Sequence, residues 1–520
     1  MADIVLINPR FEVSFWGLEF ALPFIGKSAA LPVAALPLLA ALTPPGHKLT
    51  IIDENVEPID FARCARADIV GVTGMVVQRR RMREILEQLK RRRAFTVVGG
   101  PWVSVSEGYF GALADVVFVG EADETWPRFL EEFSAGRAAA RYEQSDKTDM
   151  TRVPAPRLDL LQMRHYAFGS VQFSRGCPFQ CEFCDIIVLF GRRPRLKTEA
   201  QIIGELDGLR RRKMSFVFIV DDNLIGNKKA IKPILRCVIA WQRANGFPLT
   251  LVTEASIDLA DDDELMTLMV AANIVIVFVG VESPNEASLR ETKKLQNLRP
   301  GGNLVDKVRR IQDAGMEVWA GMILGFDHDD DRVFDAHRRF LAAARISTAM
   351  VGMLSAIPRT PLHARLAAAG RLDPADDLAY GTNVVPLQLS REALSRGYAR
   401  LMAELYAPAA FLDRCDDLYI DGRFETYRAW KDYAARHPWR RRRREARLLA
   451  EALGIAAQLL WRVPEAALRR EYRRRLWRIL RTRRDPALLH VYAVKCVMHY
   501  HAHKLARDMA GPAGAVVNSY

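Results

Sequence analysis

Short runs of β-branched residues alternate with helical stretches along roughly the first 140 residues of the chain. A strand, a helical crossover and a second strand at this spacing indicate a parallel sheet covered by helices on both faces. The runs expected to form strands are Ile4–Ile7, Leu49–Asp53, Ile69–Thr73, Thr96–Val98 and Val116–Val119. We therefore predict a doubly wound α/β unit, and such a sheet binds its ligands at the carboxyl ends of the strands.

A second alternating series begins near residue 166. Its expected strands are Ser170–Ser174, Phe216–Asp221, Leu249–Thr253, Val275–Val279, Val318–Ile323 and Ala349–Ser355. Six strands joined by helices are fewer than the eight of a closed barrel, so we predict a partial, open (β/α)6 barrel. Beyond about Pro374 the strand pattern fades, and apolar residues repeat every four positions in 468–480. That spacing predicts amphipathic helices.

The length of 520 residues excludes a single hydrophobic core. Residues 146–157 are polar and carry two prolines, which is typical of a linker. The first residues do not resemble a signal peptide, and the apolar stretch 29–42 is too short to span a bilayer, so we expect a cytoplasmic protein. The expected parts are a doubly wound sheet over 1–145, a linker over 146–165, a partial barrel over 166–373 and a helical, arginine-rich domain over 374–520.

Three of the seven cysteines lie within eight residues. Cys177, Cys181 and Cys184 form a C-x3-C-x2-C loop directly after the first barrel strand. Three thiolates on a short loop can bind three irons of a 4Fe-4S cube, and no fourth cysteine is near in sequence, so the fourth iron would keep an open position. The alternative is a zinc site completed by a distant His or Cys, because zinc accepts the same ligands. An odd number of cysteines with one tight cluster favours a metal site over disulfides.

With its flanking residues, this loop resembles the hallmark of the radical S-adenosylmethionine (SAM) superfamily. The resemblance implies that Cys177, Cys181 and Cys184 are the catalytic cluster ligands and that Phe183 packs beside the adenine of SAM. It also implies that SAM chelates the open iron and is cleaved to methionine and a 5′-deoxyadenosyl radical. The cofactor supplies this chemistry, while the barrel holds the cofactor and excludes water.

Polar residues and glycines follow the later barrel strands, at the end where barrel active sites lie. Under the same resemblance, the residues after the second strand bind the ammonium group of SAM, and a G-x-I-x-G run after the fifth lies beside its adenine. Alternatively, Asp222 or Glu282 caps the next helix. The acids 329–331 are expected to form a solvated turn. The SAM-binding candidates are Phe183, Asp221, Asp222, Asn223, Glu254, Gly280, Glu282, Ser283, Gly321, Ile323 and Gly325.

The order of sheet, barrel and helical tail resembles the cobalamin-binding-domain radical SAM proteins over most of residues 1–400. Residues 174–186 and 220–229 are most similar to the branch that contains the hopanoid C-2 methylases. The resemblance implies a Rossmann-like domain whose cobalamin carries a methyl group from one SAM, while the radical from a second SAM activates the substrate carbon. The D-x-H-x-x-G cobalamin signature is absent, since the only His before residue 150 is His47, so a ligand-free sheet is the alternative. Glycine lets a large ligand approach the backbone, and the cobalamin candidates are Gly74, Gly99, Gly100, Gly120 and Glu121.

The net charge of +13 belongs to one segment near the C-terminus. Residues 436–484 contain 17 Arg and four acids, which accounts for the whole excess. An arginine-flanked apolar stripe can lie on an anionic membrane surface, attract a nucleic acid, or dock on the barrel with a basic outer face. No nucleic-acid-binding motif accompanies the charge, so nucleic acid is the least favoured partner. His499, His501 and His503 have no evident carboxylate partner, and we do not expect them to bind a metal.

These observations leave three hypotheses. The first is a cobalamin-dependent radical SAM methylase that acts at an unactivated carbon of an apolar or lipid-like small molecule and takes electrons from a donor such as flavodoxin or ferredoxin. The second keeps the radical chemistry but makes the reaction a rearrangement, cyclisation or carbon–carbon coupling, with a vestigial or structural N-terminal domain. The third is a non-catalytic membrane- or RNA-binding protein whose cysteine loop holds zinc.

Overall fold

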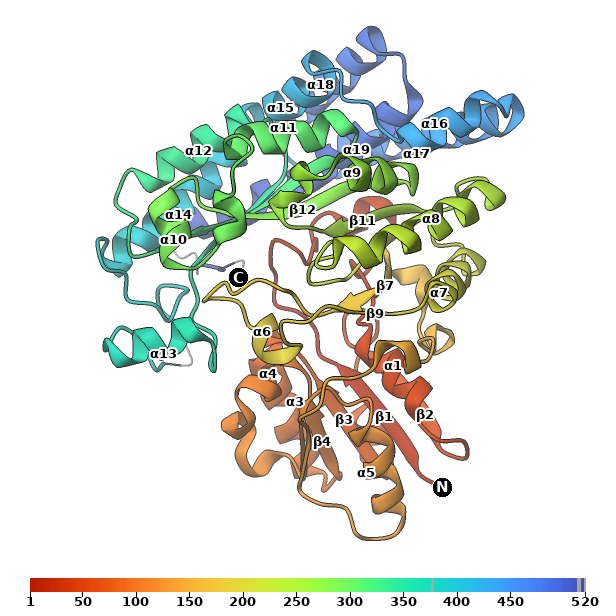
Figure 1. Cartoon of the computed structure of the whole chain (residues 1–520), viewed down its shortest axis with the longest axis vertical. Coiled ribbons are helices and arrows are strands. Elements are labelled where there is room, and N and C mark those ends of the chain that lie inside the picture. The colour runs from red at the N-terminus through yellow and green to blue at the C-terminus, as the bar shows by residue number, and fades with distance from the viewer. Residues whose placement is uncertain (376–377, 512–515, 519–520) are drawn as a thin grey trace.

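The computed structural model describes residues 1–375, 378–511 and 516–518. Two six-stranded parallel sheets form the first two parts of the molecule, one below the other, and a layer of helices covers the far end (Figure 1). This arrangement confirms the predicted class of a doubly wound sheet, a partial barrel and a helical C-terminal region. No helix in the described residues combines the length and the apolar composition that crossing a bilayer requires.

The N-terminal sheet has the strand order β2-β1-β3-β4-β5-β6. Its strands are β1 (Asp3–Asn8), β2 (Lys48–Asp53), β3 (Ile69–Thr73), β4 (Thr96–Gly99), β5 (Val116–Gly120) and β6 (Arg141–Gln144). Strand β6 was not predicted, because its sequence Arg-Tyr-Glu-Gln is polar and alternates between exposed and buried positions, as an edge strand can. The helices between the strands are α1 (Ala35–Leu42), α2 (Phe61–Cys64), α3 (Arg79–Arg91), α4 (Pro101–Val105) and α5 (Thr125–Ser134).

The second sheet has the order β14-β13-β12-β11-β10-β7 and remains open between β14 and β7. Its strands are β7 (Gly169–Val171), β10 (Phe216–Ile219), β11 (Thr250–Glu254), β12 (Ile274–Glu282), β13 (Glu317–Leu324) and β14 (Ala349–Met353). The predicted strand 170–174 is instead divided into β7 and β8 (Ser174–Arg175), which pairs with β9 (Arg195–Leu196). The division has a local cause, since the amide of Phe173 donates to the carboxylate of Asp221 at 2.6 Å.

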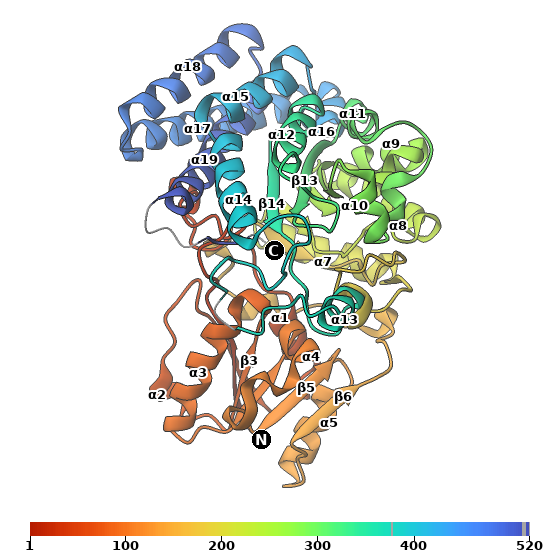
Figure 2. The ribbon, with the colours of Figure 1, turned by 90° about the vertical axis from the view of Figure 1, so that its left-hand side faces the viewer.

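Helices cover the outer face of this sheet and the far end of the barrel (Figure 2). Around the barrel these are α6 (Ile186–Leu189), α7 (Glu199–Arg211), α8 (Lys228–Asn245), α9 (Asp263–Ala271), α10 (Glu286–Glu291), α11 (Leu304–Ala314), α12 (Val333–Ala343) and α13 (Pro361–Ala368). The C-terminal helices are α14 (Arg391–Leu405), α15 (Pro408–Asp416), α16 (Arg428–Ala435), α17 (Pro438–Arg462), α18 (Ala466–Thr482) and α19 (Pro486–Ala510). Helix α19 closes the amino end of the barrel, where the buried Lys495 forms an ion pair with Glu317 at the start of β13.

The carboxyl ends of the two sheets face each other (Figure 1). Arg175 at the end of β8 contacts Glu121 at 2.7 Å and Asp123 at 2.8 Å, both just after β5. Arg195 contacts the same Glu121 at 2.7 Å. Because both sheets bind ligands at their carboxyl ends, the space between them is the expected place for the chemistry.

Candidate active site

The cysteine loop joins β8 to α6 at the carboxyl end of the barrel. It begins at Gly176, whose φ of +96° favours glycine and where a Cβ would lie 3.0 Å from the carbonyl oxygens of Gly191 and Arg193. The amide of Cys177 then donates to the Gly191 carbonyl at 3.2 Å. The start of the loop is therefore folded tightly against the segment that follows α6.

The three predicted cluster thiols are neighbours, with Cys181 buried and Cys177 and Cys184 partly buried. Burial and then Asp185 raise the pKa of Cys184 well above its ordinary value, and the nearby Cys181 and Cys177 raise it further. Amide groups approach two of the sulfurs, with Gln296 Nε2 at 3.5 Å from Cys181 Sγ and Asn223 Nδ2 at 3.9 Å from Cys177 Sγ. Within the described parts of the chain, no three His, Cys, Asp or Glu side chains gather closely enough to hold a single metal ion. The three thiols are therefore too widely spaced for one ion. They suit a multi-iron cluster, in which each thiolate binds a different iron, and the two amide groups could donate to its sulfur ligands.

Two of the predicted SAM-binding carboxylates hold the cysteine loop in place. Asp221 accepts hydrogen bonds from the Phe173 amide and, at 2.7 Å, from Ser174 Oγ. Asp222 accepts one from the Gly176 amide at 2.8 Å. Burial raises the pKa of Asp221 to about 7 and that of Asp222 to about 6, because desolvation disfavours the charged form. Neither carboxylate caps the next helix, which was the alternative for Asp222.

Glu254 ends β11 beside these carboxylates. Burial is the largest cause that raises its pKa to about 8, followed by the charges of Asp222 and Asp221. In the part of the chain that the structure describes, the Glu254 carboxylate has no hydrogen bond or ion pair. A cation beside Glu254 would favour its charged form, so this group can accept a cationic ligand.

The end of β12 carries a buried ion pair. Glu282 lies in the left-handed region with φ of +64°, and its Oε1 is 2.6 Å from Lys294 Nζ. The Lys294 ammonium also lies 5.9 Å from the ring centre of Phe183. A Cβ on Gly280 would lie 2.3 Å from Glu282 Oε1 and 2.8 Å from Lys294 Nζ, so a side chain there would displace this ion pair. Ser283 is buried, and its hydroxyl accepts the amide of Asn285. Asn285, and not Glu282, caps α10, because its side chain accepts the amide of Ala287.

The predicted adenine-binding run lies at the end of β13. Ile323 belongs to an apolar cluster in which Phe183 also packs, and Phe183 and Phe326 have ring centres 6.2 Å apart. Gly321 lies within β13, and Gly325 follows it with φ of +99°. The structure therefore places Phe183 of the cysteine loop beside the G-x-I-x-G run.

The acidic run 329–331 was expected to form a solvated turn, and this was wrong for Asp329. Asp329 is 1% exposed and accepts the amides of Gly325 and Phe326 at 2.9 and 3.0 Å and the Ser288 hydroxyl at 2.8 Å. It fixes the turn that follows β13. A run of three acids predicts a surface position, and only the fold reveals these partners.

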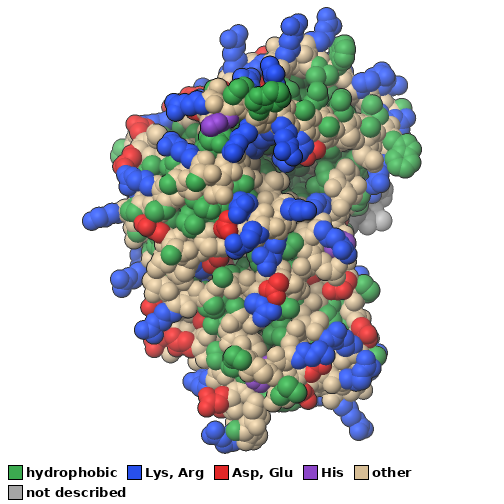
Figure 3. Space-filling view, turned by 90° about the vertical axis from the view of Figure 1, so that its right-hand side faces the viewer, with side chains coloured by type: hydrophobic (Ala, Val, Ile, Leu, Met, Phe, Trp, Pro, Cys, Tyr) green, Lys and Arg blue, Asp and Glu red, His purple; other side chains and the backbone are tan. Residues whose placement is uncertain are grey.

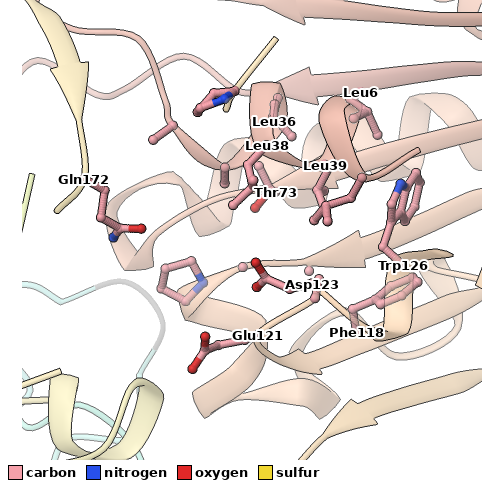
Figure 4. Close-up of a pocket in the computed structure, with 18 of the residues that line it drawn as sticks. Leu6, Leu36, Leu38, Leu39, Thr73, Phe118, Glu121, Asp123, Trp126 and Gln172 are labelled. Atoms are coloured by element: carbon pink, nitrogen blue, oxygen red, sulfur yellow. The ribbon is translucent and has the colours of Figure 1, made fainter. Parts of the chain in front are cut away.

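A cavity of about 240 Å³ opens at the carboxyl end of the N-terminal sheet (Figure 4). Gly99, Gly100, Gly120 and Glu121 line it, as predicted for the cobalamin candidates, whereas Gly74 does not. A Cβ on Gly100 would lie 2.4 Å from Thr73 Oγ1, so glycine is required there. The cavity also has an apolar wall that sequence reasoning missed, although the apolar stretch 29–42 was the available signal. This wall is formed by Leu6, Leu36, Leu38, Leu39, Phe118 and Trp126.

Comparisons with known proteins follow this division of the chain. The B12 binding domain model matches residues 28–130, the Radical SAM superfamily model matches 171–341, and a domain of unknown function matches 360–512. A hopanoid C-2 methylase from Rhodopseudomonas palustris is 32% identical over 486 residues, which cover 91% of this chain and 88% of that protein. The chain belongs to the cobalamin-binding radical SAM family.

One further relative and two solved structures are similar to this radical SAM enzyme. An uncharacterized methyltransferase from Synechocystis is 41% identical over 419 residues, covering 79% of this chain and 77% of the relative. Among solved structures, the cobalamin-dependent radical enzyme OxsB with aqua-cobalamin and SAM bound has a TM-score of 0.62 at 14% identity, covering 98% of this chain and 81% of that one. The methyltransferase TsrM from Kitasatospora setae has a TM-score of 0.58 at 17% identity, covering 76% and 81%.

These likenesses decide between the hypotheses at the level of class. The enzyme combines the domain that uses a 4Fe-4S cluster and SAM with a domain of the cobalamin-binding type. The non-catalytic, zinc-stabilised hypothesis is not supported.

Proposed function

We propose that this enzyme is a cobalamin-dependent radical SAM methylase that acts at an unactivated carbon of an apolar or lipid-like small molecule. The observation that carries the proposal is the shared wall between the cysteine loop and the glycine-lined cavity. Arg175 lines the cavity, pairs with Glu121 and stands two residues before Cys177. The groups that would hold the cluster and the cobalamin are therefore neighbours, as a transfer of a methyl group requires.

Cys177, Cys181 and Cys184 would hold the 4Fe-4S cluster. When bound, the cluster would supply the electron that cleaves SAM, and cobalamin would supply the methyl group. We assign the SAM ammonium to Glu254, because this carboxylate is available while Asp221 and Asp222 hold the loop. Phe183 and Ile323 would contact the adenine. The buried surroundings keep water away from the reacting groups.

Cobalamin would lie against Gly99, Gly100 and Gly120, with the apolar wall of α1 and Trp126 receiving its less polar part. The glycines leave backbone without side chains at this edge of the sheet. The glycines and the apolar lining of the cavity support this placement.

The inner face of the barrel supports an apolar substrate. Phe218, Phe278 and Trp319 belong to one apolar cluster, together with Trp16 from the segment after β1 and Met498 of α19. Phe218 and Phe278 remain partly exposed there. Aromatic side chains of this kind favour an apolar body over a charged one.

The reaction is tested with SAM that carries a labelled methyl group. The anaerobically reconstituted enzyme, cobalamin and a low-potential donor such as flavodoxin or ferredoxin are incubated with candidate lipids. A methylase transfers label to the substrate and forms both S-adenosylhomocysteine and 5′-deoxyadenosine. Formation of 5′-deoxyadenosine alone, with no labelled product, would favour the rearrangement or coupling reaction instead.

The cluster ligands are tested with Cys181→Ala. We expect this variant to fold but to retain far less than the about four irons per chain of a 4Fe-4S protein. Cys237→Ala is the matched control, since Cys237 lies on α8 and contacts Glu199 away from the loop. Iron content and the visible spectrum of the anaerobic protein report the result. Equal iron in both variants would refute the ligand assignment.

A further inference from the structure

Helices α17 and α18 form a hairpin at the end of the molecule opposite to the N-terminal sheet (Figure 2). One side of the hairpin is buried against the rest of the helical domain through Leu459, Leu468, Tyr472, Leu476 and Ile479. The predicted docking of this amphipathic segment on the protein therefore occurs. This docking buries only one side of the two helices.

The outer side of the hairpin also carries large apolar residues. Four of them have no apolar cover, since Leu453 is 54%, Leu460 41%, Trp461 76% and Trp477 60% exposed. Leu460 and Trp477 line a groove between the two helices. Single exposed apolar residues are ordinary on a protein surface, but two Trp and two Leu on one hairpin form an apolar patch that marks an interaction site.

The two helices and the turn that follows α18 also carry many arginines. Many of the 17 arginines in residues 436–484 are engaged, for example Arg475 with Asp416 and Arg441 with Glu445. Six others are exposed and have no hydrogen bond or ion pair within the described residues, and Figure 3 shows basic and hydrophobic side chains mixed over this end of the molecule. These six are Arg442, Arg443, Arg470, Arg473, Arg481 and Arg484. Arg470 and Arg473 line the same groove as Trp477.

We propose that this outer face of α17 and α18 docks on the surface of an anionic phospholipid bilayer. Free guanidinium groups bind lipid phosphates, and Trp side chains prefer the boundary between headgroups and acyl chains. The aliphatic Leu453 and Leu460 favour a bilayer over a nucleic acid, which offers no acyl phase to bury them. This inference goes beyond the proposed reaction and does not depend on it.

Vesicle binding by the full-length protein, without substrate, tests the proposal. Vesicles of phosphatidylcholine alone are compared with an equal mixture of phosphatidylcholine and phosphatidylglycerol. We expect binding to the anionic vesicles, little binding to the neutral ones, and loss of binding at high salt. Two double variants should each weaken binding by roughly tenfold or more. Arg470→Gln/Arg473→Gln removes two arginines that each contribute about 1 kcal/mol near an anionic surface. Trp461→Ser/Trp477→Ser removes the side chains that prefer the boundary between headgroups and acyl chains.

Two control variants carry the same chemical changes elsewhere. Leu387→Ser removes another exposed apolar residue, and Arg91→Gln/Arg137→Gln removes two exposed arginines of the N-terminal domain. Both should bind vesicles like the parent, and thermal unfolding verifies that all variants fold. Equal vesicle binding by all variants would overturn the proposal. Binding to RNA but not to vesicles, weakened only by the arginine change, would overturn it in favour of a nucleic-acid partner.

Discussion

The ammonium group of Lys294 is buried between the carboxylate of Glu282 and the cysteine loop. Burial lowers the pKa of Lys294, but the attraction of Glu282, Cys181 and Cys184 outweighs it, so the net pKa is raised. Lys294 is therefore charged at every physiological pH. A fixed positive charge beside thiolates favours the addition of an electron to a cluster that they hold.

Lys294→Met should lower the midpoint potential of the cluster. The lost charge and the unpaired Glu282 act in the same direction, and we expect a shift of roughly 60 mV, a tenfold change in a one-electron equilibrium. The control is Lys229→Met, because Lys229 is exposed on α8 and has no ion pair within the described residues. A redox titration followed by electron paramagnetic resonance measures both. An unchanged potential in the Lys294 variant would show that Lys294 does not tune the cluster.

At the scale of elements, patterns of residues predicted the strands better than the turns between them. Buried runs such as Ile69–Thr73 carry their own signal, since β-branched residues in short blocks form parallel strands. The polar β6 carries no such signal, and the run of acids that contains Asp329 indicates a solvated turn although Asp329 is buried. The glycines at the carboxyl ends of the strands were predicted from the sequence. The leucines of α1 that complete the cavity could be recognised only from the folded structure.

The turn after β13 makes stability depend on pH through Asp329. Burial raises the pKa of Asp329 to about 6, although hydrogen bonds from Ser288, Gly325 and Phe326 partly offset this. In the unfolded chain the carboxyl has a pKa near 3.9. The folded state binds the proton more tightly, so Asp329 makes the protein lose stability as the pH rises from about 4 to about 6.

Asp329→Asn should remove this contribution. Relative to the parent, the variant should gain stability between pH 4.5 and pH 7, by at most about 3 kcal/mol for two pKa units. Urea unfolding at the two pH values measures the difference. Asp330→Asn is the control, because Asp330 is at the surface and its pKa is lowered by Arg332, so it does not titrate in this range. A pH dependence that is the same in both variants would contradict the role of Asp329.

The loop between β4 and α4 contains a position where only glycine is expected to fit, and this can be tested. Gly100 has φ of +104°, and its Cβ would meet Thr73 Oγ1. Gly100→Ala should therefore cost about 1–3 kcal/mol of stability and weaken cobalamin binding. Gly108→Ala should do neither, since nothing lies within 4 Å of its Cβ and its φ is not positive. Thermal unfolding and the cobalamin absorbance retained after gel filtration distinguish them, and equal behaviour of the two variants would remove Gly100 from the site.

On the scale of the whole molecule, buried charges join the two sheets. Arg175 from the barrel reaches Glu121 and Asp123, Arg195 shares Glu121, and the Tyr166 hydroxyl donates to Asp53 at 2.7 Å. Such contacts fix the distance between the cysteine loop and the cavity. Sequence motifs predicted each domain separately, but the partners of these charges lie about 50 or more residues away, as Arg175 is 54 residues from Glu121.

Arg175→Met tests whether this ion-pair group holds the domains together. Removing one partner of a buried pair costs about 3–5 kcal/mol when it leaves a charge uncompensated. Arg195 still neutralises Glu121, but Asp123 would lose its ion pair, so we expect about 3 kcal/mol. Residues 146–165, which we predict to be a linker, should then be cleaved faster by protease, because the two sheets separate more often. Arg193→Met is the control, since Arg193 is exposed and has no ion pair within the described residues. If the linker is cleaved at the same rate in both variants, the domains are held together by other contacts, such as Tyr166 with Asp53, and Arg175 only orients Glu121 beside the cavity.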